Sequence, residues 1–214
     1  MPAVPYAGRR LALPSLVLES RLKPACMKRR LLNFVVCPEC KGQLQVDPAV
    51  ESGAEIIEGS LRCDRGHHYP IVKGIPRFVP AELYADTFGF QWNRFSKVQL
   101  DVFNNTNESE ETFLEKTNFD LALLPDKLVL DAGTGAGRFA DVASRMQAEV
   151  IGVDLSTAVE AAYANLGDRP NYILFRLIFS GYPSDRTYLI GFFRSEYYTT
   201  RLTLAKHFIV LCHS

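Results

Sequence analysis

Four side chains in the first third of the chain have the types and spacing of a metal site. Cys37 and Cys40 form one close pair, and Cys63 and His67 form a second. Tetrahedral Zn²⁺ is usually held by two such pairs, because a tight turn can direct two side chains at one point. Four protein ligands leave no open coordination position, so the sequence predicts a structural zinc site. His68 is an alternative to His67, although the Cys-x3-His spacing favours His67, and a redox Cys-x-x-Cys pair is the alternative use of the first two cysteines.

A second pattern is a glycine-rich turn led by a carboxylate, Asp131-Ala-Gly-Thr-Gly-Ala-Gly137. It follows a short apolar run, and Asp154 ends a second apolar run about 20 residues further on, where an acid can accept hydrogen bonds from ribose hydroxyls. A dinucleotide fingerprint is Gly-x-Gly-x-x-Gly, but here Arg138 stands where its third glycine belongs. Asp131 would also repel a diphosphate, whereas it suits the cationic amine of a methionine group. The sequence therefore favours S-adenosylmethionine over a nicotinamide dinucleotide or a turn without a ligand.

The residues around the cysteines resemble a known family. The segments Cys37-Pro-x-Cys-x-Gly-x-Leu44 and Gly59-x-Leu-x-Cys-x-x-Gly-His-x-Tyr-Pro-Ile-Val-x-Gly-Ile-Pro76 are similar to a small zinc-ribbon module that is attached to, or partners, many methyltransferases. The ligand pattern also resembles the amino-terminal zinc site of a bacterial ribosomal RNA guanine methyltransferase. The resemblance covers residues 37–80 and implies a role in recognising a substrate or a partner.

The glycine turn resembles the first motif of the class I S-adenosylmethionine-dependent methyltransferases. The resemblance implies methyl transfer to an unidentified acceptor, which is a small molecule or a macromolecule. Because the sulfonium already activates the methyl group, the protein mainly aligns the acceptor and excludes water, and no catalytic base is assigned. The cofactor-binding residues that it implies are Asp131, Ala132, Gly133, Gly135, Gly137, Asp154 and Leu155. The segments 88–95 and 113–117 look like a branch of this family that pairs a zinc ribbon with the methyltransferase domain; as side chains alone, Phe88, Phe90, Trp92 and Phe95 favour packing over ligand contact.

The apolar runs and helical segments that must position these residues indicate an α/β protein. We expect a Rossmann-like doubly wound sheet, incomplete at about three to five strands, preceded by a small zinc-ribbon β domain. The expected segments are a disordered basic leader at 1–30, the zinc-ribbon-like module at 31–80, an aromatic and helical connector covering the cofactor site at 81–127, the amino-terminal half of the methyltransferase domain at 128–171, and an aberrant tail at 172–214.

The tail lacks the third-strand acid and the later loop of the methyltransferase family. When the third base of each codon is read with the first two bases of the next, residues 177–182 can encode D-I-F-R-L, and residues 195–207 can encode further family-like strings. We therefore interpret the chain from about residue 172 as frameshifted, with the third strand and its successors absent and the activity impaired. The nucleotide sequence of the gene tests this hypothesis, because codons that cannot yield these strings would discard it.

Composition excludes several classes of protein. Hydrophobic residues make up 47% of the 214 residues, which is enough for a buried core. The 24 basic and 24 acidic side chains balance, so the whole chain has no basic field that indicates nucleic acid. No apolar run approaches the roughly 18 residues of a membrane span, and an odd set of five cysteines indicates a reducing, cytoplasmic setting. The alternative function is a non-catalytic zinc-ribbon interaction module with an inert methyltransferase remnant.

Overall fold

The computed structural model describes residues 26–53, 55–79, 94, 96–117, 122, 124–177, 203–205 and 208–211. The leader up to residue 25, the aromatic side chains expected at 88–95, and the tail between residues 178 and 202 lie outside these ranges. Within them, no helix has the length and apolar character needed to cross a bilayer.

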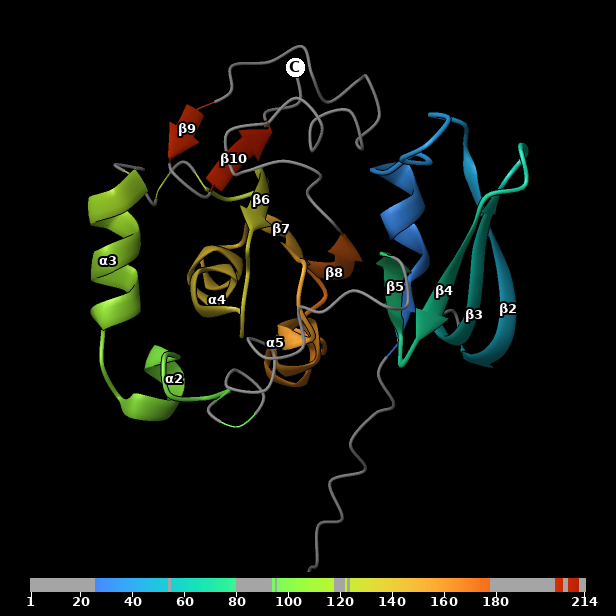
Figure 1. The fold of residues 1–214 in the computed structure, drawn as a ribbon. Helices are drawn as coiled ribbons and strands as arrows, with labels where there is room; N and C mark the ends of the chain where they lie inside the picture. The colour runs from blue at the N-terminus through green and yellow to red at the C-terminus, as the bar shows by residue number, and fades with distance from the viewer. Residues whose placement is uncertain are drawn as a thin grey trace, which may run out of the picture.

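An antiparallel β-ribbon forms the amino-terminal part of the described chain (Figure 1). It consists of β1 (Met27–Lys28), the 3₁₀ helix η1 (Arg29–Asn33), β2 (Leu44–Ser52), β3 (Glu55–Cys63), β4 (His68–Val72) and β5 (Ile75–Phe78). β3 is central, because β2 pairs with one of its edges and both β1 and β4 pair with the other. β4 and β5 are joined by Lys73 and Gly74, whose φ angles of 50° and 69° match the type I′ turn of tight hairpins.

Parallel strands alternating with helices form the second part of the chain. The order is β6 (Leu128–Ala132), α4 (Arg138–Arg145), β7 (Glu149–Asp154), α5 (Ala158–Leu166) and β8 (Tyr172–Leu177). The short helices α2 (Asp101–Asn104) and α3 (Glu108–Thr117) precede them, and β9 (Thr203–Ala205) and β10 (Phe208–Leu211) follow. β6, β7 and β8 are parallel neighbours, and β10 adds to the free edge of β6 in the antiparallel direction. The chain is thus a mixed α/β protein.

The two parts share one sheet, because β5 of the ribbon pairs in parallel with β8. The register places Arg77 opposite Arg176 and Phe78 opposite Leu177. In Figure 1 the strands follow one another from β10 through β6, β7 and β8 to the ribbon strands β5, β4, β3 and β2.

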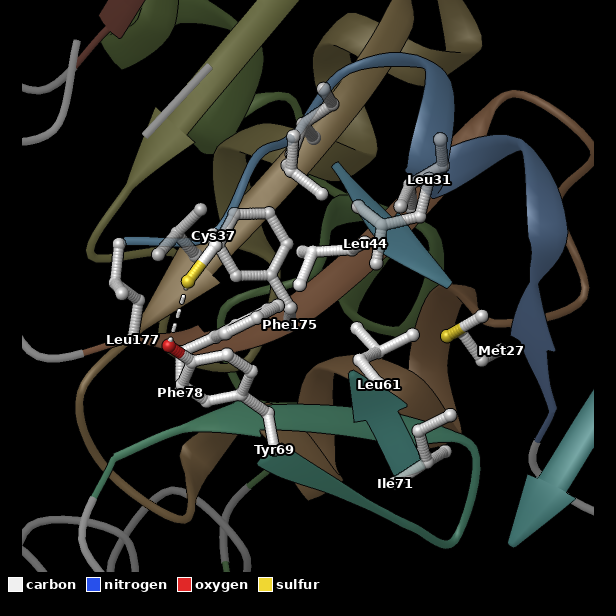
Figure 2. Packing of buried hydrophobic residues seen from close by; sticks show 14 of the residues in the cluster. Met27, Leu31, Cys37, Leu44, Leu61, Tyr69, Ile71, Phe78, Phe175 and Leu177 are labelled. Carbon is white, nitrogen blue, oxygen red and sulfur yellow. Dashed lines mark hydrogen bonds between the residues drawn. The ribbon is translucent and has the colours of Figure 1, made fainter. Parts of the chain in front are cut away.

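The two faces of the parallel strands pack against different parts of the chain. Val129, Val150 and Leu174 belong to a core formed with α4 and α5. Alternate residues such as Leu130 and Phe175 belong to a second core, which includes the buried side chains of the ribbon (Figure 2). A doubly wound sheet would carry helices on both faces, so this architecture remains a prediction that the described residues support on one face only.

Two expected boundaries differ from the arrangement of the described residues. Residues 26–30, expected in the leader, pack against the rest of the chain: Met27 is buried, and the ammonium of Lys28 donates to the carbonyls of Gly167, Arg169 and Tyr172. The third strand is also present, because Tyr172–Leu177 is β8 and every one of its residues is buried between β7 and β5. Six consecutive residues that fit a two-sided core are enough for a strand.

Candidate functional site

The first pair of predicted metal ligands lies in a tight turn after η1. The backbone N–H of Lys41 donates to the carbonyl of Cys37 at 2.9 Å, and the N–H of Cys37 donates to the carbonyl of Gly42, also at 2.9 Å. Lys41 has a φ of 61°, and a Cβ at Gly42 would lie 3.3 Å from Cys40 Sγ. The turn therefore directs both sulfur atoms toward the same side and leaves room for them.

The second pair lies where β3 turns into β4. Gly66 has a φ of 85°, and its N–H donates to the carbonyl of Cys63 at 2.9 Å. The N–H of Cys63 donates to the carbonyl of His67 at 3.1 Å, which closes the loop. His67 faces the cysteines, whereas His68 is exposed and is paired with Arg62 in the sheet. The geometry thus favours His67 over His68 as the fourth ligand.

The four donor atoms lie within 4.8 Å of one another. Cys40 Sγ is 3.6 Å from Cys63 Sγ, and His67 Nδ1 is 3.5 Å from Cys37 Sγ and 3.2 Å from Cys63 Sγ. Zinc bond lengths of about 2.3 Å to sulfur and about 2.0 Å to nitrogen require tetrahedral S···S and S···N edges of roughly 3.8 and 3.5 Å. The Cys₃His cluster therefore fits a structural zinc ion, and its two-pair arrangement is the one that the spacing predicts.

The surroundings of Cys63 favour its thiolate form. Cys37 and Cys63 are buried, and burial alone would raise the pKa of the Cys63 thiol. Hydrogen bonds from the backbone and ring of His67 outweigh that effect and lower the pKa of Cys63 to about 6. Tyr69, which the sequence analysis did not single out, places its hydroxyl oxygen 3.2 Å from Cys37 Sγ.

The glycine turn joins the end of β6 to the start of α4. Gly133, Gly135 and Gly137 have φ angles of 82°, 55° and 91°, which are left-handed conformations that favour glycine. A Cβ at Gly137 would come within 2.6 Å of Leu166 Cδ1, so α4 and α5 pack closely because this residue has no side chain. The predicted turn is present, and Ala132 lies half-buried at its start.

The two predicted acids lie at this turn, and each holds part of the chain. Asp131 Oδ2 accepts a hydrogen bond from the hydroxyl of Thr134 at 2.8 Å. Asp154 Oδ2 accepts one from the N–H of Gly135 at 2.9 Å, and its Oδ1 accepts two from Ser156, at 2.8 Å from the N–H and 2.7 Å from the hydroxyl. The structure therefore brings Asp131, the glycines and Asp154 together, with Asp154 bonded to the turn itself.

Two arginines near the turn have contacts that the sequence analysis missed. Arg176 in β8 donates from Nε to the carbonyl of Leu155 at 2.8 Å, so that expected cofactor-binding residue is tied to the next strand. Arg138 donates from Nε to the hydroxyl of Ser109 at 3.0 Å and thereby joins α3 to the start of α4. Arg138 stands inside the quoted motif, but the element that it contacts is not encoded in the spacing of the glycines.

Asp131 should make the stability of the protein depend on pH. Burial raises the pKa of its carboxyl to about 7, the Thr134 hydroxyl opposes the rise, and the charge of Asp154 adds to it. Because the folded-state pKa lies above the unfolded value, the folded chain keeps a proton that the unfolded chain loses between pH 4 and 7. The free energy of unfolding therefore falls as the pH rises through this window, by up to about 1.4 kcal/mol per pH unit.

The matched variant is Asp131→Asn, which keeps the size of the side chain and an acceptor for Thr134. Both proteins are unfolded with urea at pH 5.5 and at pH 7. The unfolding free energy of the variant, relative to that of the parent, should rise by about 2 kcal/mol between the two pH values. A difference between the two proteins that stays constant with pH would contradict the assignment.

Comparisons with known proteins match the ribbon. Residues 28–74 match the family model described as Trm112p-like protein. A UPF0434 protein of Rhodopseudomonas palustris (strain TIE-1) is 38% identical over 60 residues, which are 28% of this chain and 82% of that protein. The match to the family model includes the four cluster residues and ends before β5. Through this ribbon, the chain belongs to the Trm112p-like UPF0434 family.

Proposed function

We propose that the chain binds S-adenosylmethionine at the glycine turn and transfers its methyl group to an acceptor, with the metal-holding ribbon joined to the parallel strands through β5 and β8. The observation that carries the proposal is the meeting of the turn with two carboxylates, Asp131 near the end of β6 and Asp154 at the end of β7. Ligands of open α/β sheets bind at the carboxyl ends of parallel strands, which is the edge where these groups lie.

The charges at this edge favour the proposed cofactor over a dinucleotide. The carboxylate of Asp154 would oppose a diphosphate, whereas the cationic amine of a methionine group would favour the ionised form of Asp131, whose pKa burial raises. Asp154 would exchange its bond to Gly135 for bonds to ribose hydroxyls, since a carboxylate has lone pairs for several donors. The turn, with three glycines, would let the ligand approach the backbone closely.

Bound S-adenosylmethionine would supply a methyl group on a sulfonium, which leaves as a neutral thioether when the acceptor's lone pair forms the new bond to carbon. The acceptor's proton passes to solvent. The chain's own residues would orient the cofactor and exclude water, which is the contribution that such a reaction needs from a protein.

Isothermal titration calorimetry with S-adenosylmethionine tests the proposal. We expect saturable heat from the full chain and a roughly ten- to hundredfold weaker affinity for Asp154→Ala, because charge-assisted hydrogen bonds are lost. Asp168→Ala removes an exposed acid outside the turn and should bind like the parent. An absence of heat, or equal affinity of the parent and Asp154→Ala, would refute the proposal, and heat with NAD that S-adenosylmethionine does not displace would indicate a nicotinamide site.

The second candidate is a metal-holding interaction module whose α/β part binds no cofactor. It is favoured by the hydrogen bonds that already engage both oxygens of Asp154. Because β5 pairs with β8 in the same chain, a partner would need another surface, and in the described part of the ribbon β2 pairs on one edge only. A folded, metal-loaded chain that gives no heat with S-adenosylmethionine would support this candidate.

A further inference from the structure

We propose that Tyr69 couples metal binding at the Cys₃His cluster to the docking of the ribbon on β8. This coupling concerns the ribbon and the sheet, and it does not depend on the proposed methyl transfer. Three contacts in series carry it, and each joins side chains that are buried from solvent.

The first contact joins Tyr69 to a ligand atom. The hydroxyl oxygen of Tyr69 lies 3.2 Å from Cys37 Sγ, and the Cys37 side chain is fully buried. A metal-bound sulfur carries negative charge and a fixed position, so a hydroxyl that donates to it is held more firmly than by a mobile thiol. Metal binding therefore restrains the ring of Tyr69.

The second and third contacts lead from that ring to the shared sheet. The ring centroid of Tyr69 is 4.8 Å from that of Phe78 in β5. Phe78 in turn meets Phe175 of β8 edge-on, at 5.7 Å and an interplanar angle of 87°. Figure 2 shows Cys37, Tyr69, Phe78 and Phe175 together, with the hydrogen bond drawn between the first two.

The end of this series coincides with the β5–β8 pairing, where Phe78 lies opposite Leu177. A restrained Tyr69 fixes one side of Phe78, and Phe78 aligns the strand that pairs with β8. Because coupling free energies are reciprocal, a loosened β5–β8 contact must also weaken the hold on the metal.

Reciprocity can be measured as a double-mutant cycle on the zinc affinity, determined by equilibrium competition with a chromogenic chelator. Phe175→Leu loosens the junction without touching the cluster, and Tyr69→Phe removes only the hydroxyl. We expect Phe175→Leu to weaken the zinc affinity about fivefold in the parent and by less than about twofold in the Tyr69→Phe background. Equal factors in both backgrounds, or no effect of Phe175→Leu in the parent, would overturn the proposal.

The control variant is Tyr163→Phe, which removes a hydroxyl that bonds to the backbone of Cys26 at a distance from the cluster. In this background Phe175→Leu should still weaken the zinc affinity about fivefold. A loss of the effect in this background as well would show that the Tyr69 result is not specific, and would count against the proposal.

A second measurement uses the parent chain alone, so it stands even if Tyr69→Phe fails to fold. Hydrogen exchange is followed at increasing times after a chelator removes the metal. Protection should be lost first at the amides of Phe78 and Leu177 and later in α4. A uniform loss of protection through the sheet and α4 would contradict the coupling.

Discussion

Cys63→Ser should abolish metal binding and unfold the ribbon together with much of the shared sheet. Serine offers no thiolate, and Cys63 Sγ lies 3.6 Å from Cys40 Sγ and 3.2 Å from His67 Nδ1 in the cluster. Structural zinc contributes on the order of 10 kcal/mol in small metal domains, which is comparable to the whole stability of a typical domain. Because the ribbon core and one face of the parallel sheet form one cluster, the loss should not stay local.

Elemental analysis and thermal unfolding followed by circular dichroism measure this effect. The parent should hold about one zinc per chain, as a single four-ligand site requires. Cys26→Ser is the matched control, because Cys26 is buried but lies outside the cluster, and it should keep the metal. A Cys63→Ser protein with the parent's metal content and melting temperature would contradict the assignment of the site.

Phe175→Ala should cost about 3–5 kcal/mol of unfolding free energy, the range for truncation of a buried aromatic side chain. Phe175 is fully buried and contacts Phe78 across the line where the two parts of the chain meet. The truncation therefore leaves a cavity between β8 and the ribbon, where neither side can collapse without shifting a strand.

Urea unfolding of the metal-loaded chain measures this cost. Phe175→Leu fills most of the space and should cost about 1.5 kcal/mol or less. A loss below about 1 kcal/mol for Phe175→Ala would show that the ribbon and the sheet do not share a tightly packed core.

The metal site can be predicted from sequence because its information is local. Each pair of ligands lies within one tight turn, and the turns need only Gly42 and Gly66 at the positions where a side chain would crowd or strain them. The contact of Tyr69 with Cys37 is not predictable in the same way. It depends on how β4 lies against the first turn, which the spacing of residues in the chain does not specify.

The edge pairing of the sheet likewise could not be derived from residue patterns. Apolar alternation predicts that β6 and β7 are buried strands, and the glycines predict the turn between β6 and α4. Nothing in β5 or β8 taken separately says that these two edges meet, since many apolar strands are compatible with one another. The expectation of an aberrant tail from residue 172 rests on a missing family acid and a shifted reading frame, and it does not consider the partners of Tyr172–Leu177, which lie on both sides of it in β5 and β7.

The parallel pairing of Arg77 with Arg176 also has a consequence for synthesis on the ribosome. The two strands are separated by roughly 100 residues, which at 5–20 residues per second takes roughly 5–20 s to translate. During that interval the nascent ribbon holds its metal ligands but presents β5 as an uncovered edge, a template for wrong pairing with other chains. A chaperone that covers this edge, or a pause in translation after β8, should therefore raise the yield of folded protein without changing the mature structure.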